Sequence, residues 1–218
     1  MSNLDYKPEY QKKLPHIQPP GATFFITYRL AGSLPVQIIR QLMEELDQLK
    51  RAALTDNLPP EQADALYREQ RRAFGRFDTA LDRADTGPNW LNRPEIAQQI
   101  MDSLFFLNGE LFLLDTFCVM SNHVHVVFTP LENEDKPIAL SRILHAHKRY
   151  TAVEANKMLG LRGKFWEHES YDHVVRDDEE LLRIRKYVMN NPVKVGLIDD
   201  AADWPYSWAS WLAGDPVG

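Results

Sequence analysis

The sequence predicts an α+β domain, in which an antiparallel sheet of β-α-β-β-α-β order carries added helices. Three observations predict this class. First, a strand-like run at 23–30 is followed by long helical stretches. Second, two further strand-like runs, at 111–120 and 123–129, are nearly contiguous. Third, a last helix follows a short strand-like run. With 218 residues, of which 44% are hydrophobic, the chain can bury one such core. We therefore expect a single domain over 1–218.

The first half of the chain combines one strand with several helices. Residues 1–20 are polar and proline-rich, so we expect an N-terminal arm there. The aromatic and β-branched run at 23–30 predicts a strand. Pro35 then opens a helix with apolar residues at helical spacing, and Pro94 opens another. Between them lies a highly charged helical stretch, which we expect to be peripheral and part of a helical insertion over 50–92.

The second half begins with the two strand-like runs, which only Ser121 and Asn122 separate, so a hairpin is expected. A helix over about 138–158 and a mixed loop and strand over 165–175 follow. Asp177 or Asp178 can cap the last helix. Since the residue before a proline is pushed out of the α region, Pro192 is expected to end that helix. Residues 198–218 are interpreted as a C-terminal tail.

Charge and cysteine content restrict the classes of function. The net charge of −6 and the pI near 5.6 argue against a nucleic-acid partner when taken alone. Bases nevertheless dominate 142–164 and 183–194, so a local basic surface is compatible with an acidic chain. The single Cys118 excludes an internal disulfide. No apolar run reaches the length of a signal peptide or a membrane span, so we expect a cytoplasmic protein without a membrane partner.

His123 and His125 form the sharpest local pattern. They alternate along a predicted strand, so both imidazoles lie on one face of the sheet while Val124 and Val126 point to the other. Two imidazoles side by side are suitable ligands for a divalent metal, although a complete site needs more ligands. The pair alone is equally compatible with incidental histidines.

Tyr187 and Asn191 form a second pattern in the last helix. They are four residues apart and therefore share one helix face, at the edge of an apolar stripe. An amide oxygen is a suitable ligand for Mg²⁺ or Mn²⁺, and a phenol near a cation can act as a nucleophile. A tyrosine at the edge of the core and a helix-terminal asparagine would also explain the pair.

Together, the His-x-His strand and the Tyr-x-x-x-Asn helix resemble the single-tyrosine HUH transposases. More narrowly, the chain resembles the REP-associated tyrosine transposases. The stretches that carry this resemblance are 19–27 (PPGATFFIT), 119–125 (VMSNHVH), 165–167 (FWE), 187–197 (YVMNNPVKVGL) and 203–207 (DWPYS). The long helical stretch between 50 and 90 and the acidic net charge depart from what the family needs.

The resemblance implies a ferredoxin-like sheet and a metal-dependent enzyme that nicks and joins single-stranded DNA. It implies that His123, His125 and Asn191 hold one Mg²⁺ or Mn²⁺, and that Tyr187 forms a 5'-phosphotyrosine and frees a 3'-OH. Its implied partner is single-stranded or hairpin DNA. The sequence does not distinguish a monomer from a homodimer.

Basic and aromatic side chains supply candidates for contact with DNA. The candidate phosphate contacts are Lys148, Arg149, Lys157, Arg183, Lys186 and Lys194. Bases could stack on Trp166, Tyr171, Trp204, Tyr206 and Trp208, for which packing is the competing interpretation.

Three other functions compete with this hypothesis. A histidine-triad-like nucleotide hydrolase would need a third histidine in the alternation, where Val127 stands. A metal-dependent phosphodiesterase would use the histidine pair without Tyr187. A non-catalytic protein that binds DNA hairpins would keep the fold but cleave nothing.

Overall fold

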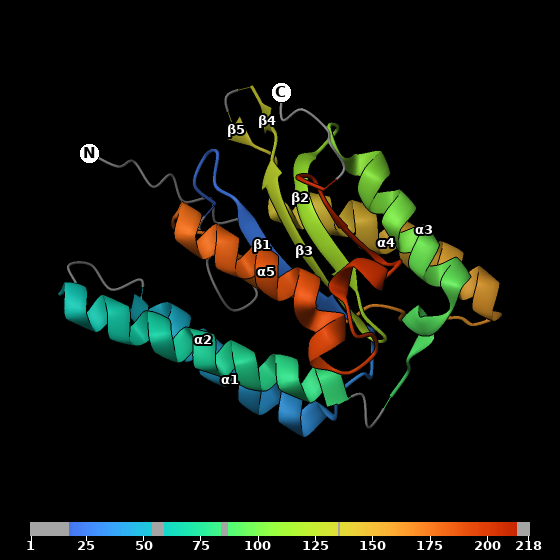
Figure 1. Cartoon of the computed structure of the whole chain (residues 1–218), viewed down its shortest axis with the longest axis horizontal. Helices are drawn as coiled ribbons and strands as arrows, with labels where there is room; N and C mark the ends of the chain where they lie inside the picture. The colour runs from blue at the N-terminus through green and yellow to red at the C-terminus, as the bar shows by residue number, and fades with distance from the viewer. Residues whose placement is uncertain (1–17, 54–58, 84–86, 135, 213–218) are drawn as a thin grey trace.

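The computed structural model describes residues 18–53, 59–83, 87–134 and 136–212, and its centre is a five-stranded sheet (Figure 1). The strand order is β6-β1-β3-β2-β7, and each neighbouring pair is antiparallel. The strands of this sheet are β1 (Phe24–Arg29), β2 (Phe112–Val119), β3 (His123–Pro130), β6 (Tyr171–Val174) and β7 (Ser207–Ala209), and a separate two-stranded sheet joins β4 (Glu132–Asn133) to β5 (Lys136–Pro137).

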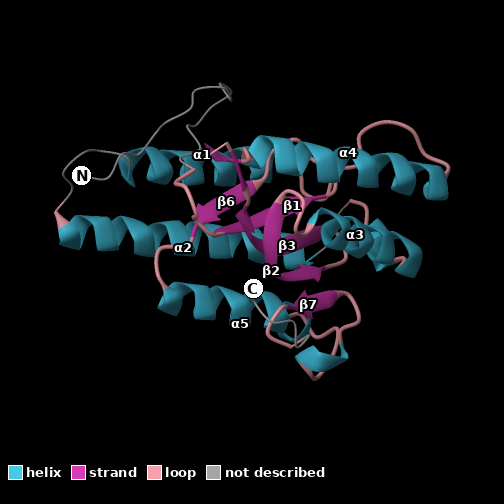
Figure 2. Ribbon diagram, turned by 90° about the horizontal axis from the view of Figure 1, so that it is seen from above, coloured by secondary structure: helices cyan, strands magenta, loops and turns pink. Residues whose placement is uncertain are grey.

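Helices cover both faces of the sheet (Figure 2). The helices are α1 (Val36–Ala53), α2 (Pro60–Arg83), α3 (Pro94–Leu107), α4 (Leu140–Leu159) and α5 (Asp178–Lys194), with 3₁₀ turns at Trp90–Asn92 and Ala201–Asp203. Helices α3 and α4 share one buried apolar cluster with the sheet, whereas α1, α2 and α5 share the cluster on the opposite face. Within the described residues, no helix is long and apolar enough to cross a membrane.

The alternation of β3 explains the two layers. Val124, Val126 and Phe128 point into the cluster beneath α3 and α4. Val127 points into the cluster beneath α2 and α5, and the two histidines share its face of the strand. One strand therefore supplies both the core of one layer and the polar groups of the other.

The predicted α+β class, with an antiparallel sheet and added helices, is confirmed. The β2–β3 hairpin forms where the sequence predicts it, and the Asp177 side chain caps α5 by accepting a hydrogen bond from the backbone of Glu180. A short strand, β7, also forms within 198–218 and extends the sheet beyond β2. The predicted N-terminal arm falls largely on residues 1–17, outside the described residues.

The expectation that the charged helical stretch is peripheral is wrong. Most residues of α2 that face inward are apolar, and Phe74, Phe77 and Leu81 are buried in the same cluster as Val188 of α5. They recur every three or four residues, which places them on one stripe. Helix α2 therefore packs over the sheet face that carries the histidines, and its charges lie mainly on the other side.

Pro192 does not end α5, which continues to Lys194. A proline removes one backbone donor, but only Val193 and Lys194 follow Pro192 in the helix. The last turn is closed instead by bonds from Val195 to the Asn191 carbonyl and from Leu197 to the Pro192 carbonyl. Gly196 adopts a φ of +73°, which suits the end of a helix. Asn191 thus stays helical and remains aligned with Tyr187.

Candidate metal and tyrosine site

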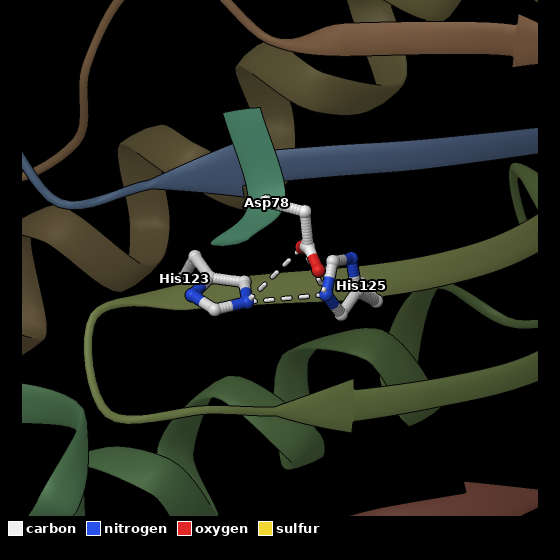
Figure 3. A group of neighbouring side chains, drawn as sticks. All are labelled: Asp78, His123 and His125. Atoms are coloured by element: carbon white, nitrogen blue, oxygen red, sulfur yellow. Dashed lines mark hydrogen bonds and ion pairs between the residues drawn. The ribbon is translucent and has the colours of Figure 1, made fainter. Parts of the chain in front are cut away.

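The two histidines predicted from the sequence lie side by side on β3 (Figure 3). Their Nε2 atoms are 3.1 Å apart, and both side chains are buried, with exposures of 1% for His123 and 0% for His125. Residue alternation on a strand dictates the shared face, and the packing of α2 and α5 above it excludes water. The predicted juxtaposition of the two imidazoles is present.

Hydrogen bonds at the other ring nitrogen orient each imidazole. Nδ1 of His123 lies 2.7 Å from Oδ1 of Asn122, whose amide nitrogen donates to the Leu81 carbonyl at 3.0 Å. Because that second bond fixes the amide, Nδ1 of His123 must donate the hydrogen, which leaves Nε2 with a free lone pair. Nδ1 of His125 lies 2.8 Å from the Thr27 hydroxyl. Such outer contacts are typical of histidines that bind metals.

Asp78 of α2 completes a group of three side chains that could hold a metal ion. Its Oδ1 atom lies 3.2 Å from Nε2 of His125 and 3.9 Å from Nε2 of His123 (Figure 3). All three side chains are buried. A carboxylate and two imidazoles form a ligand set that suits divalent metals such as Mn²⁺ and Zn²⁺.

The charge states of the group follow from burial and from close neighbours. Burial raises the pKa of Asp78, but His125, His123 and the Tyr187 hydrogen bond outweigh it and hold that pKa well below its usual range. Burial and the neighbouring His125 lower the pKa of His123 to about 3. Asp78 is therefore ionised and His123 neutral near pH 7, which are the forms that bind metal.

Tyr187 and Asn191 of α5 reach the same group. Nδ2 of Asn191 lies 2.6 Å from Nε2 of His125, and the Tyr187 hydroxyl donates a hydrogen bond to Oδ2 of Asp78. The Tyr187 ring centroid is 5.5 Å from that of His125. Burial, and then the charge of Asp78, raise the pKa of Tyr187 well above its ordinary value. The phenol is thus protonated in this arrangement.

Lys194, one turn beyond Asn191, bridges two carboxylates of α2. Its Nζ atom lies 2.9 Å from Oδ2 of Asp78 and 2.7 Å from Oδ2 of Asp82. Burial and the neighbouring Asp78 raise the pKa of Asp82 to about 6, despite the opposing charge of Lys194. Two acids thus face one lysine at the buried site.

Among the described residues, three oxygen atoms around the histidines are buried and have no hydrogen-bond partner. They are Oδ1 of Asp78, Oδ1 of Asp82 and Oδ1 of Asn191. Orphaned buried acceptors are costly, and a cation would satisfy them. Two ligands at right angles about a small divalent ion are roughly 3 Å apart. The His123–His125 and His125–Asp78 separations have this value, so the residues fit a divalent ion.

The six basic candidates are divided between opposite faces of the sheet. Lys148, Arg149 and Lys157 lie on α4, and the other three lie on α5, on the side of the sheet that carries the histidines. The Lys148 ammonium uses its three donors on the carbonyls of Glu167 and His168 and on the Ser170 hydroxyl. Burial, and then Arg29, lower the pKa of Lys148 to about 7. The Lys148 ammonium is therefore engaged in contacts within the protein.

Most of the aromatic candidates pack within the protein. Trp166 and Tyr171 are buried, and the Trp204 indole donates to the Val119 carbonyl. The Trp208 ring lies 5.5 Å from that of Phe105. For these residues, the structure favours the packing interpretation.

Asp78 and Asp82 are the site residues that sequence reasoning missed. A signal exists, because Asp78 is four residues after Phe74 and three before Leu81 and so lies within the apolar stripe of α2. A carboxylate on a buried stripe needs a partner. Its partners, however, are far along the chain and cannot be found from local spacing.

Comparison with known proteins finds a match to a family model over part of the chain. Residues 99–191 match the family model described as "Transposase IS200 like". The matched segment includes both histidines, Tyr187 and Asn191. It excludes α1 and α2 and therefore excludes Asp78.

Two curated relatives are similar over a comparable length. A protein of Haemophilus influenzae (strain ATCC 51907 / DSM 11121 / KW20 / Rd), provisionally named a REP-associated tyrosine transposase, is 29% identical over 96 residues, which are 41% of this chain and 54% of that protein. The REP-associated tyrosine transposase of Escherichia coli (strain K12) is 27% identical over 96 residues, 44% of this chain and 53% of that protein. The chain thus spans about half the length of the curated relatives it matches.

One solved structure, of a REP-associated tyrosine transposase bound to a REP hairpin, matches with a TM-score of 0.45 and 18% identity, over 90% of this chain and 82% of that chain. The sequence relatives and the family model agree with the resemblance read from the motifs. That resemblance is therefore confirmed: residues 99–191 match the model of the IS200-like transposase family, and the chain resembles the REP-associated tyrosine transposases.

Proposed function

We propose that this chain is a transposase-like enzyme that nicks and joins single-stranded DNA, with Tyr187 as its nucleophile. The observation that carries the proposal is the meeting of the two motifs within one chain. Asn191 lies 2.6 Å from His125, and Tyr187 contacts the same Asp78 that approaches both histidines. Because one chain supplies both parts, the proposed site needs no second copy. The proposed substrate, cellular DNA, fits the cytoplasmic location expected from the sequence.

His123, His125 and Asn191 would hold one Mg²⁺ or Mn²⁺. Half a turn of the Asn191 amide exchanges its two terminal atoms and would direct the orphaned oxygen at the ion, in place of the nitrogen. The bound ion supplies polarisation of the scissile phosphate and neutralisation of charge that develops there. The outer contacts of Asn122 and Thr27 hold the imidazoles in the orientation this requires.

Tyr187 performs the covalent step. Its phenol oxygen forms a bond to phosphorus while the bond from phosphorus to the 3'-oxygen breaks. The phenol proton is balanced by the proton gained on the leaving 3'-oxygen, so the products are a 5'-phosphotyrosine and a free 3'-OH. The reverse reaction with another 3'-OH joins strands without an external energy source. Helix α5 presents the phenol and the amide on one face, one turn apart.

Hairpin DNA is the proposed partner, and the solved REP-associated tyrosine transposase is itself bound to a REP hairpin. Arg183, Lys186 and Lys194 are the basic candidates on the helix that carries Tyr187, so they are the nearest to the site along the chain. Arg149 and Lys157 lie on the other face, where they could hold a distal part of the DNA.

The test is the formation of a covalent adduct. We would incubate the protein and Mn²⁺ with a pool of single-stranded hairpin oligonucleotides that carry a 3'-fluorescein label. A 5'-phosphotyrosine retains the labelled 3' fragment, so a fluorescent band that survives denaturation is expected. Tyr187→Phe should abolish the band. Tyr150→Phe is the matched control, because Tyr150 is exposed, follows two basic residues and lies away from the histidines.

An adduct that Tyr187→Phe leaves intact would show that another residue is the nucleophile. DNA cleavage without any adduct would favour a metal-dependent phosphodiesterase. Binding without cleavage would favour a non-catalytic hairpin-binding protein.

A further inference from the structure

Helix α2 closes the proposed site. His123, His125 and Asn191 are each at most 1% exposed, and the apolar stripe of α2 is buried over the same sheet face. A phosphodiester of DNA cannot reach side chains that are buried in this way. The described arrangement is therefore a closed one, and the site must open before DNA is bound.

The carboxylate of Asp78 contacts the groups that a scissile phosphate would have to meet. It accepts a hydrogen bond from Tyr187, lies 2.9 Å from the Lys194 ammonium and is 3.2 Å from Nε2 of His125. These are the proposed nucleophile, a cationic side chain and a proposed metal ligand. Carboxylates and phosphodiesters are both oxygen anions that accept hydrogen bonds from such groups.

We propose that α2 is a built-in inhibitor, in which Asp78 occupies the place of the scissile phosphate and must leave when DNA binds. The inference rests on the proposed function, because it takes its substrate from there. Asp82 reinforces it, since its carboxylate binds the same lysine. The family segment 99–191 does not include α2, so the inhibitor belongs to the part of the chain that lies outside that segment.

Helix α2 is attached by polar contacts at its two ends and by its apolar stripe between them. At one end the Tyr67 hydroxyl donates to Glu180 of α5, and at the other the Leu81 carbonyl accepts from Asn122. Helix α1 packs along α2 rather than on α5, so the two helices form a pair (Figures 1 and 2). Displacement of α2 would break these polar contacts and expose the apolar stripe that contains Phe74, Phe77 and Leu81.

The chain forms a narrow neck where it enters and leaves this helical pair. Gly32 and Gly87 have φ values of +76° and +84°, in the region that favours glycine. A Cβ atom on Gly87 would lie 2.1 Å from the Gly32 carbonyl oxygen. The close approach of two glycines is a suitable pivot for the pair, because neither carries a side chain.

The test combines hairpin binding with the exposure of α2, and neither depends on catalysis. We would measure the affinity for the labelled hairpin pool by fluorescence anisotropy in Mn²⁺. Asp78→Asn keeps the shape and removes the charge, and we expect it to tighten binding about tenfold, equivalent to about 1.4 kcal/mol. Asp64→Asn removes an exposed charge from the same helix and should change the affinity little.

Tyr67→Phe separates displacement of the helix from simple removal of a repelling charge. It breaks the contact between Tyr67 and Glu180 of α5. Tyr67 lies 11 residues before Asp78 on α2, and the substitution leaves the charge of Asp78 unchanged. We expect it to tighten DNA binding about threefold if α2 must leave. Amide hydrogen exchange in 60–83 of the wild-type chain should also rise at least tenfold when the hairpin pool is added.

Equal affinities of the wild-type, Asp78→Asn and Tyr67→Phe proteins, at whatever level, would overturn the proposal. Unchanged or slower exchange in α2 with DNA bound would do so too, and would make Asp78 a permanent part of the site. Absence of an adduct in all variants, with the affinities and exchange as expected, would instead refute the role of Tyr187 and leave the inhibitor standing.

Discussion

Asp78 and Tyr187 are joined by a hydrogen bond although 109 residues separate them in the sequence. This contact places the phenol beside the histidine pair and links α2 to the matched family segment. Burial and the neighbouring carboxylate keep the phenol protonated. It follows that the proposed nucleophile is protonated in this arrangement, and that its surroundings would have to change before it could react.

Replacement of Asn191 by alanine should weaken metal binding. Asn191 supplies one of the three orphaned oxygens around the histidines, and the substitution would remove a proposed ligand. We expect the dissociation constant for Mn²⁺, measured by isothermal titration calorimetry, to rise about tenfold or more. Asn190→Ala is the matched control, because Asn190 is the neighbouring residue and is exposed. Equal effects of the two substitutions would contradict the assignment of Asn191 as a ligand.

Thr27→Val should act on the metal through His125. The substitution keeps the shape of the side chain and removes the hydroxyl that lies 2.8 Å from Nδ1 of His125. Loss of an outer partner of this kind reduces metal affinity about 10- to 100-fold. Thr23→Val is the control, since the Thr23 hydroxyl bonds to that of Thr129 instead. If both variants bind Mn²⁺ equally well, the hydroxyl does not orient the imidazole.

Substitution by alanine at two glycines should change the free energy of unfolding in opposite directions. Gly87→Ala introduces a Cβ that clashes with the backbone of Gly32 at a positive φ, and we expect it to lower the free energy of unfolding by about 1–3 kcal/mol. Gly75 lies within α2 and has open space around its Cβ position, so Gly75→Ala should raise stability by about 0.5–1 kcal/mol. Urea denaturation measures both. A neutral Gly87→Ala would argue against a tight neck.

Glu180 should make the free energy of unfolding depend on pH in the acidic range. Burial raises its pKa, but hydrogen bonds from His173 and Tyr67 outweigh this and lower the pKa to about 2. The stabilisation is therefore complete above the pKa of the unfolded chain, near 4.3, and is lost as the pH falls toward 2. Allowing for solvent around Arg176, we expect a loss of about 2 kcal/mol over this range.

Glu180→Gln should flatten the stability profile between about pH 4 and pH 2. Glu179→Gln is the control, because Glu179 is next to Glu180 in the sequence and its side chain is 87% exposed. Denaturation curves collected at several pH values give the comparison. A profile for Glu180→Gln as steep as that of the wild type would place the acid-sensitive group elsewhere.

The parts of the site that obey local periodicity could be predicted from the sequence. Alternation along a strand puts His123 and His125 on one face, and a spacing of four puts Tyr187 and Asn191 on one helix face. Both predictions concern groups within a single element. Their meeting rested on the family resemblance, because no spacing rule places α5 over β3.

The contributions of α2 could not be predicted in the same way. Charged residues outnumber apolar ones in this helix, which led to the expectation of a peripheral position. What decides its place is a short stripe of apolar residues that includes Asp78, and the partners of that acid come from β3 and α5. Pro192 is a similar case. The rule that a helix ends before a proline is local, whereas the end of α5 is held by bonds to the Asn191 and Pro192 carbonyls, which that rule does not consider.

The most direct measurement is to locate the covalent bond. After reaction with the hairpin pool and Mn²⁺, the adduct would be trimmed with nuclease, digested with trypsin and analysed by mass spectrometry. The account predicts a nucleotide phosphate on the peptide that contains Tyr187. A nucleotide on any other tyrosine, or cleaved DNA with every tyrosine unmodified, would contradict it.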